Sequence, residues 1–333
     1  MATYKGIQGY SVQKLATDPT ASEAGGQLWY NSTSGKFKIS TEGAGTWASG
    51  GVLSSPRGEG AGAGTQTAGI AMGGRLVPGS GATVVDVTET YAGSSWTEVN
   101  NLTSARRSLS SAKQGTTTAS LVFGGDATGS PTFRDLTESY NGTSWSEVGD
   151  LTMTKEFAAG AGTQTAALSF GGGTDPEPTL TTNMQSWNGT SWANGNSLNT
   201  GRHRLGGTGT TTAALAFGGQ TPSATDITEQ WNGTSWAEVN DLNSARATMG
   251  SGGTSTAAIS MGGSPFGGLT EIWDGTSWTE VADLATGIHG NAGSGGTTGA
   301  AFLAGGFSDA STAPTATEEW TDPVYTIKTV TVS

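Results

Sequence analysis

GTQTAGIAMGG (64–74) is the stretch that decides the fold, because close copies of it recur along the chain. The other copies are GTTTASLVFGG (115–125), GTQTAALSFGG (162–172), GTTTAALAFGG (209–219), GTSTAAISMGG (253–263) and GTTGAAFLAGG (296–306). Their closing Gly-Gly pairs follow one another at intervals of 43 to 51 residues. Such a period predicts a series of equivalent supersecondary units, and such a series offers a binding surface more readily than a catalytic pocket.

The composition predicts an all-β protein. Glycine accounts for 55 of the 333 residues and charged residues for only 13%, while the abundant Thr, Ser and Trp favour strands and turns. The net charge of −12, without a cluster of Lys or Arg, argues against nucleic acid as a partner. There is no apolar run of about 18 residues, so we expect no membrane insertion. The start of the chain does not have a signal-peptide profile, and the absence of cysteine excludes disulfides and thiolate metal sites.

Each copy of the repeat contains the material for four short strands. In the fifth copy (244–284), the phrase leads through a polar loop to TEIWDG (270–275) and then to TSWTEVADL. Asn-Gly or Asp-Gly dipeptides predict tight hairpins before the last strand. We expect the tryptophan after each turn to fill the space between neighbouring units, and the small residues of the phrase to form the innermost strand. These tryptophans are Trp47, Trp96, Trp145, Trp192, Trp236 and Trp278.

The repeat resembles the kelch repeat. The Gly-Gly pair is followed by a Glu-x-aromatic element, as in Glu89-Thr-Tyr91, then by Trp, and then by Leu-x-x-x-Arg, as in Leu102 and Arg106. Lys155 and Ile288 replace the arginine in two copies. The resemblance implies a kelch-like β-propeller, and six copies imply six blades.

The two ends of the repeat array complement each other. The last copy reaches Trp320 without a following Trp-containing strand, whereas a spare one surrounds Trp47. Pairing of these two strands closes the ring and removes exposed sheet edges. We therefore expect a propeller over 46–322 and a separate C-terminal strand over 323–333, which pairs near the seam or with another subunit.

The remaining segment, 1–45, is predicted to be an N-terminal arm with a β-hairpin over 25–40 and Ser34-Gly35 in its turn. Within it, QLWYNSTSGKFK (27–38) resembles hairpins of bacteriophage tail-fibre and other virion proteins. The arm joined to kelch-like repeats resembles structural proteins of tailed phages. This resemblance implies a virion protein assembled in the bacterial host cytoplasm, and possible trimers. The arm would contact other virion proteins through Tyr4, Tyr10, Trp29 and Tyr30.

Catalytic chemistry is weakly represented. The kelch-fold enzyme galactose oxidase needs a cysteine, and this chain has none and only His203 and His289 as histidines. Equivalent positions in successive copies carry Glu89, Glu138, Glu229, Glu271 and Glu318, and a further set consists of Arg57, Arg106, Arg202 and Arg246. Repetition favours structural roles, with the glutamates bonded to a neighbouring turn and the arginines bonded between blades. We predict no enzyme activity, no cofactor and no metal.

The loops between Gly-Gly and Glu-x-aromatic differ most between copies. They leave equivalent strand ends and should share one face, where recognition residues commonly lie. The side chains predicted to bind a ligand or partner are Arg75, Phe133, Arg134, Asp175, Phe266 and Phe307; the alternatives are plain connectors or subunit packing. The leading hypothesis is adhesion to a host-surface glycan. Passive decoration of a capsid or fibre and a propeller glycosidase are the alternatives.

Overall fold

The computed structural model describes residues 12–20, 26–76, 83–127, 134–174, 179–265, 267–308, 314–322 and 325–331. All regular structure among them is β, which confirms the all-β prediction. The chain divides into two compact units, Trp47–Thr321 and Met1–Thr46 with Asp322–Ser333. The C-terminal strand shares the smaller unit with the N-terminal segment.

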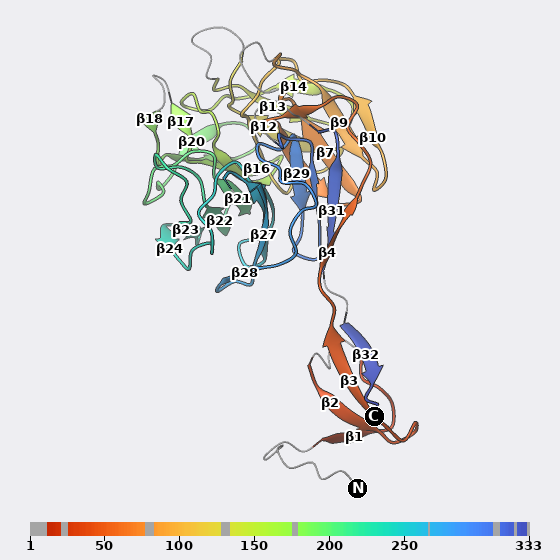
Figure 1. The fold of residues 1–333 in the computed structure, drawn as a ribbon. Coiled ribbons are helices and arrows are strands. Elements are labelled where there is room, and N and C mark those ends of the chain that lie inside the picture. The colour runs from red at the N-terminus through yellow and green to blue at the C-terminus, as the bar shows by residue number, and fades with distance from the viewer. Residues whose placement is uncertain are drawn as a thin grey trace. The chain divides into compact units, whose positions relative to one another are not determined.

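Six four-stranded sheets are formed by the described residues of the larger unit, and we number them in chain order. Figure 1 labels most of their strands. Sheet 1 consists of β6 (Ala61–Thr65), β7 (Ala68–Met72), β9 (Thr88–Tyr91) and β10 (Trp96–Val99); sheet 2 of β11 (Ser110–Ser111), β12 (Ser120–Phe123), β13 (Thr137–Tyr140) and β14 (Trp145–Glu147); sheet 3 of β15 (Ala159–Thr163), β16 (Ala166–Phe170), β19 (Met184–Trp187) and β20 (Trp192–Asn194).

Sheets 4 to 6 repeat the same order. Sheet 4 consists of β21 (Gly206–Gly209), β22 (Ala214–Phe217), β23 (Thr228–Trp231) and β24 (Trp236–Glu238); sheet 5 of β25 (Gly250–Gly253), β26 (Ala258–Gly263), β27 (Gly267–Trp273) and β28 (Trp278–Glu280); sheet 6 of β29 (Gly293–Gly296), β30 (Ala300–Ala304), β31 (Thr317–Thr321) and β4 (Thr46–Ser49). Two short pairs, β5 (Arg57–Gly58) with β8 (Arg75–Leu76) and β17 (Gly173–Thr174) with β18 (Thr179–Leu180), lie beside them.

The first strands of the sheets contact one another in a circle. Strand β6 contacts β11, and the series continues through β15, β21, β25 and β29 back to β6. Sheet 6 takes its outer strand β4 from the other end of the unit, as predicted. The rings of Trp47 and Trp320 lie 5.6 Å apart at this junction. The arrangement is therefore propeller-like.

The innermost strands are not the ones predicted. The recurring phrase covers the end of the innermost strand, its turn and the whole second strand, so that Ala61–Thr65 lies inside Ala68–Met72. The inner strands are richer still in small residues, because they pass closest to their neighbours. A Cβ added to Gly62 would lie 2.2 Å from the backbone nitrogen of Ser294 in the adjoining sheet.

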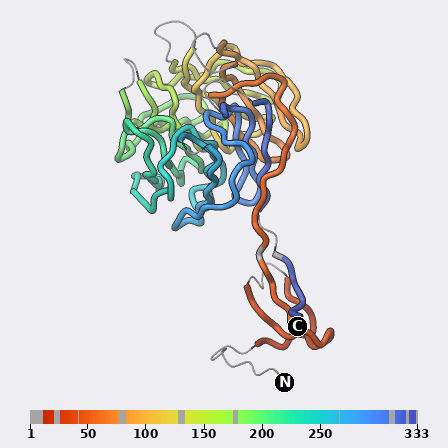
Figure 2. The backbone as a smooth tube through the Cα atoms, viewed as in Figure 1, coloured from red at the N-terminus to blue at the C-terminus, as the bar shows by residue number. Residues whose placement is uncertain are grey.

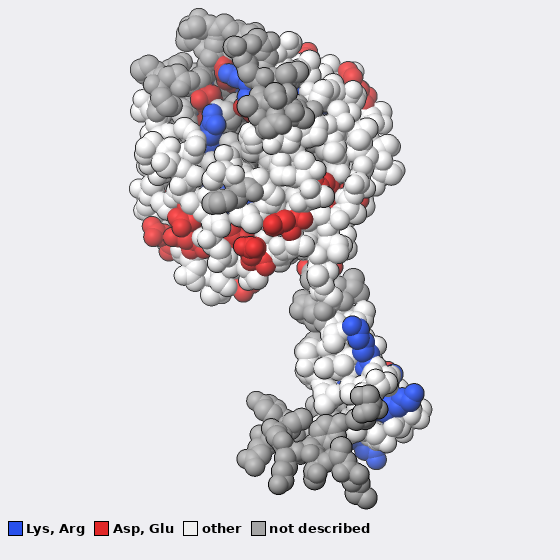
Figure 3. Space-filling model, in the orientation of Figure 1, with Lys and Arg blue, Asp and Glu red and all other residues white. Residues whose placement is uncertain are grey.

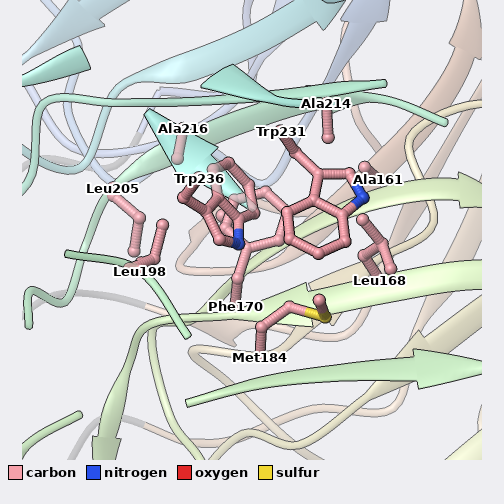
Figure 4. Packing of buried hydrophobic residues seen from close by; sticks show 11 residues of the cluster. Ala161, Leu168, Phe170, Met184, Leu198, Leu205, Ala214, Ala216, Trp231 and Trp236 are labelled. Atoms are coloured by element: carbon pink, nitrogen blue, oxygen red, sulfur yellow. The ribbon is translucent and has the colours of Figure 1, made fainter. Parts of the chain in front are cut away.

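Tryptophans fill the space between sheets, as predicted. Figure 4 shows Trp236 of β24 beside Phe170 of β16 in the preceding sheet, and their ring centroids are 5.0 Å apart. Trp231 lies against the same Trp236 at 5.5 Å. Burial of each such side chain contributes roughly 1.5–3 kcal/mol, so the repeated tryptophan holds neighbouring sheets together.

The Asn-Gly turns differ in detail from the prediction. Only the glycine has positive φ, as at Gly142 (+91°). The Asn141 side chain instead accepts hydrogen bonds from the backbone N–H groups of Thr143 and Ser144, both at 2.9 Å. The loop is therefore a four-residue connection stabilised by an asparagine side chain rather than a two-residue turn.

The smaller unit is a four-stranded sheet in the order β1 (Gln13–Leu15), β2 (Leu28–Asn31), β3 (Lys36–Glu42) and β32 (Tyr325–Thr329). The predicted hairpin is present, with Gly35 at φ +65° in its turn. Figure 2 shows strands from both ends of the chain in this sheet. The C-terminal strand thus pairs with β3 rather than with the larger unit.

Candidate ligand site at the axial mouth

A buried ion pair recurs behind the candidate site. Arg106 donates to Glu138 at 2.8 Å and Arg246 donates to Glu271 at 3.0 Å, and these side chains are at most 1% exposed. Arg57–Glu89 and Arg202–Glu229 form the same pair. The arginine side chains therefore bond within their own copy, and not between copies as predicted.

The glutamates also hold the connection from the preceding sheet, as predicted. Glu138 accepts a hydrogen bond from the backbone N–H of Thr103 at 2.6 Å, and Glu271 from that of Asn243 at 2.8 Å. Breaking such a buried charged network is costly. These carboxylates and guanidiniums are structural, which removes both sets from the candidates for chemistry.

Two copies depart from this pair. In sheet 3, Lys155 stands in place of the arginine and Gln185 in place of the glutamate, and the lysine Nζ donates to the Asn183 carbonyl at 2.9 Å. Burial lowers the pKa of Lys155 to about 7. In the last copy Ile288 replaces the arginine, and Glu318 accepts from the backbone of Ala285 and Thr286.

Three consecutive residues begin each copy with distinct roles. The first is the buried arginine, or the Lys155 or Ile288 that replaces it. Its backbone carbonyl accepts a hydrogen bond from the N–H of the second glycine in the preceding copy's Gly-Gly pair, as in Gly74 N–H to Arg106 O at 2.8 Å. The second forms a β-bridge to the residue after that copy's own Gly-Gly pair, as in Arg107 with Asp126. The third lies at the axis. The triplets are 57–59, 106–108, 155–157, 202–204, 246–248 and 288–290.

The third residues form a closed ring of backbone hydrogen bonds, which we call the axial mouth. The N–H of Ser108 donates to the carbonyl of Glu59 at 2.7 Å, and each successive copy repeats this bond until Gly290 donates to Thr248 and Glu59 donates to Gly290. All the ring residues have φ between +49° and +58°. The members are Glu59, Ser108, Phe157, Arg204, Thr248 and Gly290.

Charged side chains gather on the sheet 1 and sheet 2 part of the mouth. Glu59 binds Arg75 at 2.7 Å and Arg107 at 3.6 Å, and Arg107 also binds Asp126 at 2.7 Å. Burial works against the charge of Arg107, but its hydrogen bond to Asp126 and the charge of Glu59 outweigh it, and the pKa is raised. The arginines are thereby fixed in position while a third or less of each side chain stays exposed.

Aromatic and basic groups occupy the opposite part. The Arg204 guanidinium lies over the Phe157 ring at 4.2 Å. His203 Nε2 lies 3.0 Å from Gln220 Oε1, and burial, helped by the charge of Arg204, lowers its pKa. By ring order, sheet 4 lies across the axis from sheet 1, so Arg204 and Glu59 stand on opposite sides of the mouth.

An axial cavity of about 90 Å³ opens at this mouth. Its wall includes the ring residues Glu59, Phe157 and Arg204, and deeper in it lie Ser251 and Lys113. A cavity of this size, with both polar and apolar side chains in its wall, suits one small functional group of a larger ligand bound at the mouth.

The distribution of cations supports this location. The larger unit contains ten Lys and Arg residues, and five of them are buried behind the mouth. The others are Arg75, Arg107, Arg134 and Arg204 on the loop side, and Lys113 in the cavity. Figure 3 shows the blue atoms of this unit near its upper end, with red atoms beside them, whereas the red atoms along its lower rim have no blue atoms next to them. Exposed acids on outer strands include Glu147, Glu238 and Glu280.

The predicted binding residues differ in where they lie and in how exposed they are. Arg75 lies at the mouth, stacked on Phe307 with its guanidinium carbon 4.9 Å from the ring centroid. Phe307 is only 2% exposed and also contacts His289, so its ring supports Arg75 and is closed to a ligand. Arg134 is half-buried in the loop beside Gly125. Phe133, Asp175 and Phe266 lie outside the described residues.

The predicted docking residues of the smaller unit also differ in exposure. Trp29 is 1% exposed and donates to Asp18 at 2.9 Å, which makes it a core residue of that sheet. Tyr30 is half-buried against Phe37, with centroids 5.2 Å apart. Tyr4 and Tyr10 lie outside the described residues.

Sequence reasoning missed Glu59, Phe157, Arg204 and Lys113. A signal for the first three was available, since they stand two residues after the repeated basic position, where side-chain type changes from copy to copy. Where the flanking residues repeat from copy to copy and one position between them varies, the repeated residues maintain the fold and the variable side chain is free to bind a ligand. For Lys113 the signal was the dipeptide Lys113-Gln114, which stands where the other copies have a glycine at the end of the inner strand.

Two features are absent from the described residues. They contain no group of three or more His, Cys, Asp or Glu arranged to hold a metal ion. They also contain no helix that is long and apolar enough to cross a membrane.

Comparison with known proteins bears on the fold alone. No protein-family model matches the sequence. No curated protein sequence matches it significantly. A solved structure described as "Structure of YjhT" is similar, with a TM-score of 0.65 and 14% identity over 83% of this chain and 99% of that chain. At this identity the likeness supports a β-propeller-like all-β fold.

Proposed function

We propose that this chain is a non-enzymatic binding protein whose axial mouth recognises a carbohydrate. One observation carries the proposal: every cation of the larger unit outside the buried core lies on the loop side or in the axial cavity. Sugars are bound by planar arginine and carboxylate groups that donate and accept hydrogen bonds, next to aromatic faces. Arg204 with Phe157, and Arg75 with Glu59, supply these groups in fixed positions.

The proposed scaffold is a closed six-bladed, kelch-like propeller. Its support is the circle of contacts between inner strands and the ring of backbone hydrogen bonds through all the third residues. In this scaffold the repeated triplet separates two tasks. The first residue builds the blade, and the third presents a side chain to the mouth.

The proposed setting is a tailed-phage virion, with the ligand a polysaccharide of the host surface. The support is the resemblance of 27–38 and of the repeat array to virion proteins. The smaller unit would contact other virion proteins, and Tyr30 is the docking candidate that remains partly exposed. Imaging of an affinity-tagged chain on intact particles tests this setting, and a label absent from the particle would reject it.

The binding test uses the full chain and a panel of bacterial surface polysaccharides. Arg204→Gln should weaken binding by about tenfold, because a charged hydrogen bond contributes roughly 1.5 kcal/mol or more. Glu238→Gln, which changes an exposed outer-strand acid, is the matched control and should leave binding unchanged.

Other outcomes favour the rival functions. Absence of binding to every polysaccharide would reject recognition and favour passive decoration. Release of reducing sugar, lost on Glu59→Gln or Asp126→Asn, would favour a glycosidase, since these carboxylates remain at the mouth once the buried glutamates are set aside.

A further inference from the structure

The second copy breaks the repeat at the end of its innermost strand. Five copies have a glycine there with φ between +90° and +109°: Gly64, Gly162, Gly209, Gly253 and Gly296. In the second copy the inner strand β11 ends at Ser111, and Lys113 and Gln114 follow before Gly115. Since five sheets form without this insertion, the fold does not require it.

The insertion sends two side chains across the axis. Gln114 Nε2 donates to the carbonyl of Gly253 in sheet 5, opposite sheet 2, at 2.7 Å. Lys113 Nζ donates to Ser294 Oγ in sheet 6 at 3.3 Å. Lys113 thereby lines the axial cavity, and its neighbour Gln114 connects sheet 2 to sheet 5.

The ammonium lacks a counter-charge from the protein. No carboxylate in the described parts of the chain forms an ion pair with Lys113. The cavity wall contributed by the inner strands includes Ser111, Gly160, Gly207 and Ser251, none of which carries a charge. Burial lowers its pKa to about 8, so it is still mostly protonated at neutral pH. Lys113 is half-buried, and a cation partly withdrawn from water in this way is stabilised when an anion accompanies it.

We infer that the axial cavity receives one carboxylate group and that Lys113 is the cation that binds it. The inference rests on the proposed function and narrows its ligand to an acidic glycan, one carboxylate of which enters the axial cavity. An ammonium suits this position because it offers three donors around a point charge, and Ser294 takes only one of them. Arg204 at the rim adds attraction for the same charge.

The test titrates the full chain by calorimetry with sodium formate, sodium glucuronate and glucose. Wild type should bind formate and glucuronate, and Lys113→Gln should raise both dissociation constants by about tenfold or more. Lys36→Gln removes an exposed cation of the smaller unit, and should change them by about twofold or less. Equal affinities in wild type and Lys113→Gln would overturn the inference.

A second measurement needs no variant. Formate should protect the Lys113 amine of the wild-type chain from reductive methylation, read by mass spectrometry, while Lys36 of the smaller unit reacts at an unchanged rate. Failure of formate to protect Lys113 would also overturn the inference.

The two proposals fail separately. If polysaccharide binds equally well to wild type and Lys113→Gln, the proposed function stands and the carboxylate site is rejected. If no polysaccharide binds but formate binding depends on Lys113, the carboxylate site stands and carbohydrate recognition is rejected.

Discussion

The first and third residues of each triplet stand two positions apart, yet they follow opposite rules. Arg202 is fully buried against Glu229, and copies of this pair lie behind the mouth in four sheets. Arg204 shares its backbone hydrogen-bond ring with five other residues, and none of the six has the same side chain. The backbone hydrogen bonds repeat from copy to copy at both positions. The two positions therefore differ in whether the side chain must also pair with a buried partner.

The difference teaches where to look for function in a repeat protein. At the first position the side chain must match a buried partner and a backbone turn, and few residue types satisfy both. At the axial mouth the hydrogen bonds are made by the backbone, which leaves the side chain free to serve a ligand. Changes at the two positions should therefore differ in what they damage.

The largest expected effect is loss of the buried pair. Arg246→Met leaves the Glu271 carboxylate buried without its cation, which should lower the free energy of unfolding by about 3–5 kcal/mol. Arg204→Met at the mouth loses a stacking contact worth about 1 kcal/mol or less. Urea unfolding followed by tryptophan fluorescence measures both. Equal losses for the two arginines would break the comparison.

The second effect separates backbone strain from lack of space. Gly290 at the mouth and Gly305 in the interior have φ of +54° and +57°. A Cβ on Gly290 meets nothing nearer than 3.5 Å, whereas one on Gly305 would lie 2.6 Å from the Arg57 carbonyl. Gly290→Ala should therefore cost about 1 kcal/mol of left-handed strain, and Gly305→Ala about 2 kcal/mol more from overpacking. The same urea titration measures both, and similar costs would show that strain alone governs these glycines.

The sequence predicted what depends on local pattern. Strand and turn content, the tryptophans between sheets and closure through Trp47 followed from the spacing of copies. The Gly-Gly phrase was assigned to the innermost strand because it is rich in small residues, but the preceding segment, such as Gly250–Gly253, is richer still. Crowding at the axis, rather than regularity, identifies the inner strand.

Apart from the closure through Trp47, the specific pairings between residues distant in sequence were beyond prediction. Arg106 and Glu138 were each recognised as repeated, but their pairing joins residues 32 positions apart and depends on how the chain crosses between sheets. The partner of the C-terminal strand, β3, is about 285 residues away. At the mouth no residue type repeats, so no pattern announced Arg204, and only its constant place after Arg202 could have.

The smallest expected effect concerns sheet 3, one of the two copies that lack the buried Arg–Glu pair. The pKa of Lys155 is about 7 in the folded protein because of burial, against 10.5 for an ordinary lysine. Below both values each state is protonated, and above both each is neutral. Between them the unfolded chain holds the extra proton, so stability should rise with pH, by roughly 2 kcal/mol from pH 7 to about 9.

The pKa of Lys113 is lowered as well, so the pH dependence of stability should be measured in the Lys113→Gln background. There, Lys155→Met should remove the rise, and Gln185→Glu should reduce it by supplying the carboxylate that pairs with arginine in other sheets. A rise that persists unchanged in Lys155→Met would show that the buried lysine is not the titrating group, and that sheet 3 tolerates the loss of its ion pair for another reason.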